Sequence, residues 1–449
     1  DCLMFSKFID AFKNKDVRGR IFFTLGILFI YIIGLLITVP GVDSSGIGGV
    51  IAENDLLGVM NLLSGGALDQ FSIFALGVSP YITASIIIQL LQLGVLPALQ
   101  ELGEQGEAGK RKINDITRYL GLLLGAVQAY GIIVTLQNRN LIDFSLMFGG
   151  SLAESNRLWL GYLYVIAILL AGTMFTLWLS DQITAKGIGN GVSMIIFAGI
   201  IKGIPGNFSQ IYDILVPVSA AGTEALNGLL KFIAYVIYTL VIVIFVVFIE
   251  TAVRKIPIQQ SKATMSQSNS HMNFLPIKLN PSGVIPVIFA QAVLTAPVTI
   301  MGFINPNGEA YETVQRIFSL TETVNGWPLA LIIYLVLIIL FSFMYAHIQI
   351  DPEKLSENLT KQGSYIPGIR SGSETKNYLS RVLNRVTFTG AIALAVIAAL
   401  PILVPLIFPV LGASSFGGTG LIIVVGVALE TTKQIEGYVA EKNYKTFKF

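Results

Sequence analysis

Few residues in this chain could do chemistry. His271 and His347 are the two histidines, and neither has a cysteine or carboxylate at the spacing of metal ligands. Cys2 is the single cysteine, which excludes an internal disulfide framework. Neither a GxSxG nucleophile elbow nor a Walker phosphate loop occurs in the sequence. These absences argue against a metal enzyme, a serine hydrolase and a nucleotide-driven motor.

One glycine-rich run resembles a phosphate-binding loop superficially: Gly187-Ile188-Gly189-Asn190-Gly191. It follows an apolar stretch that reads as a helix rather than a strand, and it lacks a glycine at the sixth position. We interpret it as a helix start at which two backbones approach closely.

The elements that must position any site are long apolar stretches. A helix needs about 20 residues to cross a hydrocarbon core of about 30 Å. With 53% hydrophobic and 12% charged residues, the sequence predicts an all-α membrane protein. We place ten spans at 21–40, 71–96, 117–136, 158–180, 188–204, 229–250, 283–302, 328–350, 386–410 and 417–435. The run from Ile21 is too long for a cleaved signal and reads as the first span.

Basic residues fall on alternate connections between these stretches. Of the 29 Lys and Arg, those on one side are Arg139, Arg157, Lys202, Lys231 and Arg316. All the others share a side with both termini. Because cytoplasmic loops carry the excess of Lys and Arg, we expect both termini in the cytoplasm.

Ionisable side chains are nearly absent from the interiors of the stretches. Asp181 and Glu250 fall at cytoplasmic ends, and Glu430 lies near one. An aspartyl membrane protease needs facing acids, and proton-coupled transporters place ionisable groups at the midplane. Sodium can still bind carbonyls at broken helices, so an inverted-repeat secondary transporter stays an alternative. The uncharged polar residues at depth are Thr83, Gln89, Gln92, Gln128, Gln291 and Thr295.

Three connections stand out. The segment Asp55 to Leu68 is apolar but too short to span, so it either re-enters the membrane or lies on its outer surface. Two cytoplasmic connections, at about 250–281 and 349–385, are longer than simple helix connections, and such loops are often functional. The second contains Arg370 between apolar neighbours, which a mere topology signal explains poorly.

Several separate strings resemble the SecY family of protein-conducting channels, in family order over essentially the whole chain. They are SGGALDQFSIFALGVSPYITASIIIQLLQ (64–92), EQGEAGKRKI (104–113), GIGNGVSMIIFAGI (187–200), LPIKLNPSGVIPVIFA (275–290), NLTKQGSYIPGIRSG (358–372) and FGGTGLIIVVGVALE (416–430). The resemblance implies ten transmembrane helices in two pseudo-symmetric inverted halves, 1–204 and 205–449. It also implies a re-entrant plug helix at about 55–69, with plug residues Leu56, Met60, Leu63, Ser64, Gly65 and Gly66.

The resemblance also implies a pore and a gate. An apolar pore ring would comprise Val78, Ile82, Val192, Ile196, Ile285, Ile288 and Ile423. Val78 and Ile82, like Val192 and Ile196, stand four apart and so share a helical face. A lateral gate would comprise Thr83, Gln128 and Gln291.

Finally, the resemblance implies a channel without enzyme activity or cofactor, in the bacterial cytoplasmic membrane. It would conduct secretory polypeptides and release membrane segments sideways into lipid. Expected partners are the membrane subunits SecE and SecG, the motor ATPase SecA, the ribosome, signal peptides and nascent chains. Expected contact residues for SecA or the ribosome are Arg370, Arg254, Lys255, Lys110, Arg111 and Lys112.

The chain departs from the family pattern at a few positions. Tyr31 stands where bacterial members commonly carry arginine, and Ser180-Asp181 stands where Gly-Glu is usual. The connection at 250–281 is shorter and less basic than in the family. A specialised accessory SecY that exports few substrates is a second alternative.

Overall fold

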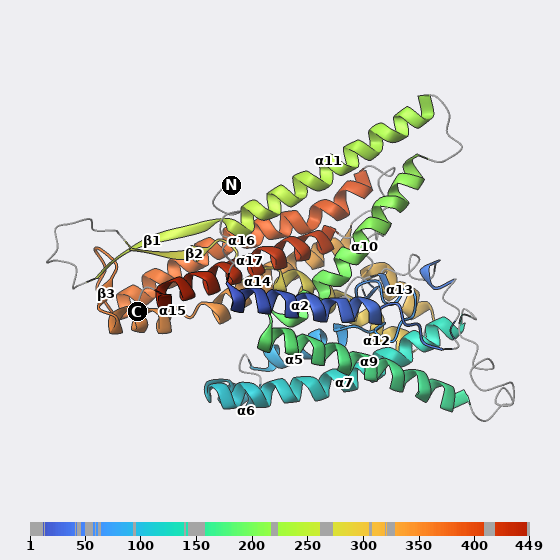
Figure 1. The fold of residues 1–449 in the computed structure, drawn as a ribbon, viewed down its shortest axis with the longest axis horizontal. Coiled ribbons are helices and arrows are strands. Elements are labelled where there is room, and N and C mark those ends of the chain that lie inside the picture. Colours follow the sequence, from blue (N-terminus) through green and yellow to red (C-terminus); the bar gives the residue numbers. More distant parts are fainter. Residues whose placement is uncertain are drawn as a thin grey trace. The chain divides into compact units, whose positions relative to one another are not determined.

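Most of the described residues are helical. The computed structural model describes residues 12, 14–40, 42, 46–49, 57–58, 60–61, 64–92, 96–138, 141, 158–216, 223–260, 273–304, 308–318, 320, 328–407 and 418–446. A helix forms in each of the ten predicted stretches (Figure 1). They are α2 (Lys15–Gly34), α5 (Ser79–Gln92), α7 (Glu107–Asn138), α9 (Leu158–Lys186), α10 (Gly191–Leu215), α11 (Thr223–Thr251), α12 (Ile285–Ile304), α14 (Leu329–Gln349), α16 (Ser373–Ile407) and α17 (Gly418–Thr446).

Among the described residues, seven helices are each long and apolar enough to cross a membrane. The helix α5 and the following α6 (Pro97–Glu104) form a bent pair that would be an eighth span, and α12 is a shorter apolar helix. The helix α5 starts eight residues later than the predicted stretch, because residues 71–78 form consecutive turns. Phe71 and Gly77 in these turns have φ angles of 43° and 53°, which a helix does not accommodate.

Two short helices and one sheet complete the fold. The helices are α13 (Glu309–Phe318) and α15 (Pro352–Lys361). The strands β1 (Val253–Gln260), β2 (Asn273–Lys278) and β3 (Ser364–Tyr365) form an antiparallel sheet in the order β2-β1-β3. Figure 1 shows the β1–β2 hairpin continuing from the end of α11. In the register of this pair, Ile256 lies opposite Leu275.

The chain forms two compact units. Unit 1 comprises Asp1–Tyr212, Ala292–Leu329 and Val427–Phe449, and unit 2 comprises Asp213–Gln291 and Ala330–Gly426. These units are defined by contacts, whereas the halves 1–204 and 205–449 are defined by an internal symmetry. The division into halves therefore stays a prediction.

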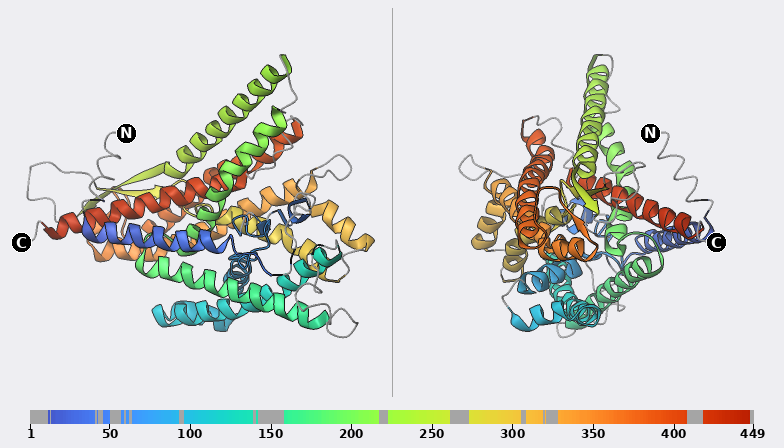
Figure 2. Two further views of the ribbon diagram at one scale, coloured as in Figure 1. Left: turned by 45° about the vertical axis from the view of Figure 1, so that its right-hand side comes forward. Right: turned by 90° about the vertical axis from the view of Figure 1, so that its left-hand side faces the viewer.

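Glycines allow the close packing of unit 1. A Cβ atom on Gly121 of α7 would lie 3.3 Å from the Cα of Tyr81 on α5, and one on Gly125 would lie 3.5 Å from Pro80. The helix α7 also packs along α9, and Figure 2 shows the two side by side. These helices enclose an apolar cluster that includes Ile133 and Leu169, both fully buried.

Candidate functional site

The segment predicted to be the plug packs inside unit 1. Leu57 and Met60 belong to the same buried cluster as Ile133 of α7 and Leu169 of α9. Met60 is 7% exposed and Ser64 is fully buried. Of the predicted plug residues, Leu56 and Leu63 lie outside the described residues. The described residues 57–58 and 60–61 are helical and pack against other parts of unit 1.

Asn61 organises the turn that follows. Its side-chain Oδ1 accepts hydrogen bonds from the backbone N–H groups of Leu68 and Asp69, each at 3.2 Å. Its backbone carbonyl accepts the N–H of Gly66 at 2.8 Å and the hydroxyl of Ser64 at 3.1 Å. Asn61 thus accepts four hydrogen bonds from residues that follow it in the segment.

Tyr31 and Gly199, which lie outside the segment, contact its centre, and we call these two residues the seat of the segment. The Tyr31 hydroxyl on α2 donates a hydrogen bond to the Ser64 carbonyl at 2.9 Å, and Tyr31 is fully buried. Its ring stacks on Phe74 with centroids 5.7 Å apart and planes 11° from parallel. On α10, Gly199 lies directly against Gly65, which has a φ of 72°. A side chain on either glycine would overlap with the backbone of the other.

Four of the predicted ring residues belong to unit 1. Val78 is buried in the turn before α5 and Ile82 is buried in the first turn of α5, and the N–H of Ile82 donates to the carbonyl of Val78 at 3.0 Å. On α10, Ile196 is buried and Val192 is half-buried. Gly199 follows Val192 by seven residues and therefore shares its helical face.

The other three ring residues belong to unit 2. Ile288 and Ile423 are buried, and Ile285 is the half-buried first residue of α12. A Cβ atom on Gly426 of α17 would overlap with Val284, so α17 packs against the start of α12. Ile423 stands one turn before Gly426, on the segment beside α12. Whether all seven residues converge on one opening stays a prediction, because they come from both units.

Two of the predicted gate residues have unusual surroundings. The side-chain oxygens of Gln128 and Gln291 are buried and, within the described part of the chain, accept no hydrogen bond. The Thr83 hydroxyl instead donates to the Ser79 carbonyl of its own helix at 3.1 Å. A buried amide oxygen without a donor costs about 1–3 kcal/mol, so both glutamines are poised to gain a partner.

Arg370, the principal predicted docking residue, is exposed beside a tight turn. The N–H of Ile369 donates to the carbonyl of Ile366 at 3.1 Å, with Pro367 and Gly368 between them. Gly368 has a φ of 82°, so the turn is of type II. Ile366 is buried in the apolar cluster of unit 2, and Ile369 packs on that cluster. The turn is therefore fixed at both ends while Arg370 faces solvent.

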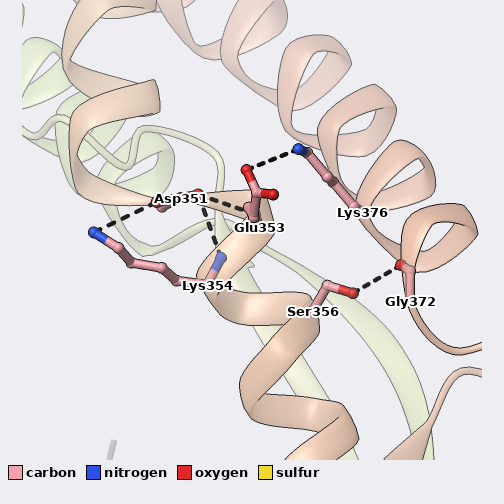
Figure 3. Close-up of polar contacts among 6 residues, drawn as sticks. All are labelled: Asp351, Glu353, Lys354, Ser356, Gly372 and Lys376. Atoms are coloured by element: carbon pink, nitrogen blue, oxygen red, sulfur yellow. Dashed lines mark hydrogen bonds and ion pairs between the residues drawn. The ribbon is translucent and has the colours of Figure 1, made fainter.

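Polar contacts brace the helices on either side of this turn (Figure 3). Asp351 caps α15 by accepting the N–H of Glu353 at 2.9 Å. Lys376 of α16 pairs with Glu353 at 2.8 Å, and the Ser356 hydroxyl donates to the Gly372 carbonyl at 2.9 Å. Exposed ion pairs each contribute at most about 1 kcal/mol, but together these contacts fix the ends of the turn.

The other predicted docking residues are exposed and lie on two elements. Arg254 and Lys255 are neighbours on β1, so their side chains point to opposite faces of the hairpin. Lys110, Arg111 and Lys112 lie in the first turns of α7, in unit 1. These positions suit contact with a soluble partner, although the structure contains none.

Three residues at the seat were not predicted to have a role. Tyr31 was noted only as a departure from the family pattern, which named no contact. Asn61 is a polar residue within an apolar segment, and this does not indicate what it contacts. Gly199 carried no signal of its own, because a glycine in an apolar stretch is common.

Comparisons with known proteins show the family and the fold of the chain. The SecY family model matches residues 72–432. The protein translocase subunit SecY 1 of Lactobacillus kefiranofaciens subsp. kefiranofaciens is 44% identical over 448 residues, which cover 99% of this chain and 100% of that protein. The protein translocase subunit SecY of Staphylococcus carnosus (strain TM300) is 40% identical over 445 residues, covering 99% of each.

Two solved structures share the fold. One, described as a protein conducting channel, aligns with a TM-score of 0.65 at 19% identity, covering 93% of this chain and 91% of the other. A second, described for a SecY plug domain that stabilises the closed state, aligns with a TM-score of 0.62 at 19% identity and the same coverage. Together with the full-length relatives, they identify the chain as a multi-pass membrane protein of the SecY family.

Proposed function

We propose that this protein is the channel subunit of a bacterial protein translocase. It would pass unfolded secretory polypeptides across the cytoplasmic membrane and release apolar segments sideways into lipid. The observation that carries the proposal is the segment with the buried residues Leu57, Met60 and Ser64, whose Gly65 lies against the face of α10 that bears Val192 and Ile196. A short segment packed in that position suits an element that blocks an opening. Full-length relatives named protein translocase subunit SecY support the same function.

The proposed mechanism uses the apolar ring as a seal. Branched aliphatic side chains can close around a translocating chain of varying sequence without offering it hydrogen bonds. A narrow apolar constriction also resists water and ions. Since the sequence contains no Walker loop, the energy comes from a partner such as SecA or the ribosome, or from the proton-motive force. The channel itself then needs no catalytic residue.

The proposed topology places both termini in the cytoplasm. Arg370 and the β1–β2 hairpin would then lie on the cytoplasmic side, where SecA and ribosomes act. A solved relative with a similar fold is Sec61 in a canine ribosome-channel complex, with a TM-score of 0.62. The small membrane subunits SecE and SecG complete the proposed assembly.

Site-specific crosslinking tests the proposal. Ile196→Cys is placed in a Cys2→Ser background, and a secretory chain with one cysteine is arrested part-way through export. We expect a disulfide between the arrested chain and position 196 that depends on arrest. The control is Ile244→Cys on α11, because Ile244 is 67% exposed on the outside of its helix and is not a predicted ring residue.

Absence of crosslinked adducts would overturn the assignment of these residues to the pore ring. With arrest confirmed, no adduct at cysteines placed singly at Ile196, Ile82, Ile288 and Ile423 would contradict the pore assignment. An equal yield at Ile244 would indicate nonspecific contact and would also contradict it.

A further inference from the structure

We propose that Tyr31 is a positioning residue that holds the plug segment in its seat through one releasable hydrogen bond. The inference rests on the proposed channel function, because a seat matters only if the segment blocks an opening. The bond joins the Tyr31 hydroxyl of α2 to the Ser64 carbonyl at 2.9 Å. Both residues are fully buried.

The hydroxyl is aimed at Ser64 by its ring. Phe74 stacks on the Tyr31 ring at 11° from parallel and lies flat over Gly34, where a Cβ atom would overlap with the Phe74 ring. Phe175 of α9 stacks on Phe74 in turn, with centroids 6.0 Å apart. This aromatic stack restricts the Tyr31 ring, so the hydroxyl is held in place before the segment docks. Preorganisation of this kind lowers the entropy that docking costs.

Among the described residues, the other hydrogen bonds of residues 60–69 stay within the segment or reach the turns at 71–72. The bonds of Asn61 are internal to the segment, and Gly65 meets Gly199 through van der Waals contact. Removing the Tyr31 hydroxyl leaves the Ser64 carbonyl buried without its donor, which favours displacement of the segment. One neutral hydrogen bond corresponds to roughly a fivefold change in a population. Tyr31 therefore tunes how often the plug leaves its seat.

Thiol labelling of the plug tests this role. Met60→Cys, in a Cys2→Ser background, gives a buried probe in the full-length channel purified with its membrane subunits in nanodiscs. We expect Tyr31→Phe, which keeps the ring and removes the hydroxyl, to speed labelling of position 60 by a water-soluble maleimide about fivefold or more. The matched control is Tyr238→Phe, which removes a hydroxyl that donates to the Leu400 carbonyl at 3.1 Å within unit 2. Tyr238→Phe should leave labelling at position 60 unchanged.

A second probe separates seating from general loosening. Ile133→Cys lies in the same apolar cluster but on α7, outside the plug segment. Faster labelling at position 133 as well as 60 would mean that Tyr31 only stabilises unit 1, and would overturn the inference. Unchanged labelling at position 60 would also overturn it. Because labelling needs no export, these failures are distinct from a missing adduct in the arrested-chain experiment, which would contradict the channel itself.

Discussion

Gly65 and Gly199 touch through their backbones, so that neither position has room for a Cβ atom. Gly65 belongs to the buried segment and Gly199 to α10, on the face that also carries Val192 and Ile196. Because neither residue has a side chain, the backbone of the segment can lie directly against α10. Since the backbones already meet, nothing flexible is available to make room for an added methyl group.

Replacing Gly199 by alanine should displace the segment. The new methyl group would overlap with the Cα of Gly65, and overpacking of this kind costs about 1–3 kcal/mol. We expect Gly199→Ala to raise the resting ion conductance of the channel in planar bilayers. Gly206→Ala on the same helix is the matched control, because a Cβ atom there meets nothing within 4 Å. Equal conductance in the two variants would show that the segment does not seal the channel.

The two buried glutamines should set how readily the gate opens. Replacing both Gln128 and Gln291 by leucine removes two side-chain oxygens that accept no hydrogen bond within the described residues. The closed state loses that penalty, so a signal sequence must supply more binding energy to shift the population. We expect the double variant to require more hydrophobic signal sequences, measured by export of a reporter with graded signals. An unchanged threshold would remove these residues from the gate.

Reversing the charge at Arg370 should separate export from insertion. Arg370 is exposed on a fixed turn, and a charge reversal there opposes contact with an acidic partner surface. We expect Arg370→Glu to block export of secretory proteins while membrane proteins still insert. Lys361→Glu is the control, since Lys361 is 73% exposed and pairs with Glu357 alone among the described residues. Normal export in Arg370→Glu would refute the docking role.

The turn beside Arg370 should matter through its geometry. Gly368 has a φ of 82°, and alanine in that conformation costs about 1 kcal/mol. We expect Gly368→Ala to reduce export by misplacing Arg370. Gly363→Ala imposes a similar strain at a φ of 66°, at the end of α15 and farther along the chain from Arg370. If both variants lose export equally, the defect reflects strain rather than the position of Arg370.

Apolar runs predicted the existence of the helices better than their ends. The helix α7 begins at Glu107, ten residues before the predicted stretch, because a helix can continue into the polar and basic residues beyond the membrane. The reverse holds at 71–78, which is apolar but forms turns that use positive φ angles at Phe71 and Gly77. Hydropathy measures where a segment is stable in lipid and does not register backbone geometry.

The hairpin escaped prediction for a different reason. Pro257 on β1 and Pro276 on β2 interrupt what would otherwise read as strands, since proline lacks a backbone donor. A proline is tolerated at a strand position whose N–H would point away from its partner. The seat of the plug was equally hidden, because the bond between Tyr31 and Ser64 joins residues 33 positions apart that share no motif.

The hydrogen bonds that converge on Asn61 have an energetic consequence for opening. The side chain and carbonyl of Asn61 satisfy donors of Ser64, Gly66, Leu68 and Asp69, so all of these bonds lie within the segment, and leaving its seat need not break any of them. Displacement therefore resembles undocking of a small folded loop rather than local unfolding. The chain does not have to be reordered each time the opening is closed again. A channel built this way can reseal quickly after each substrate, since the loop returns with its shape already formed.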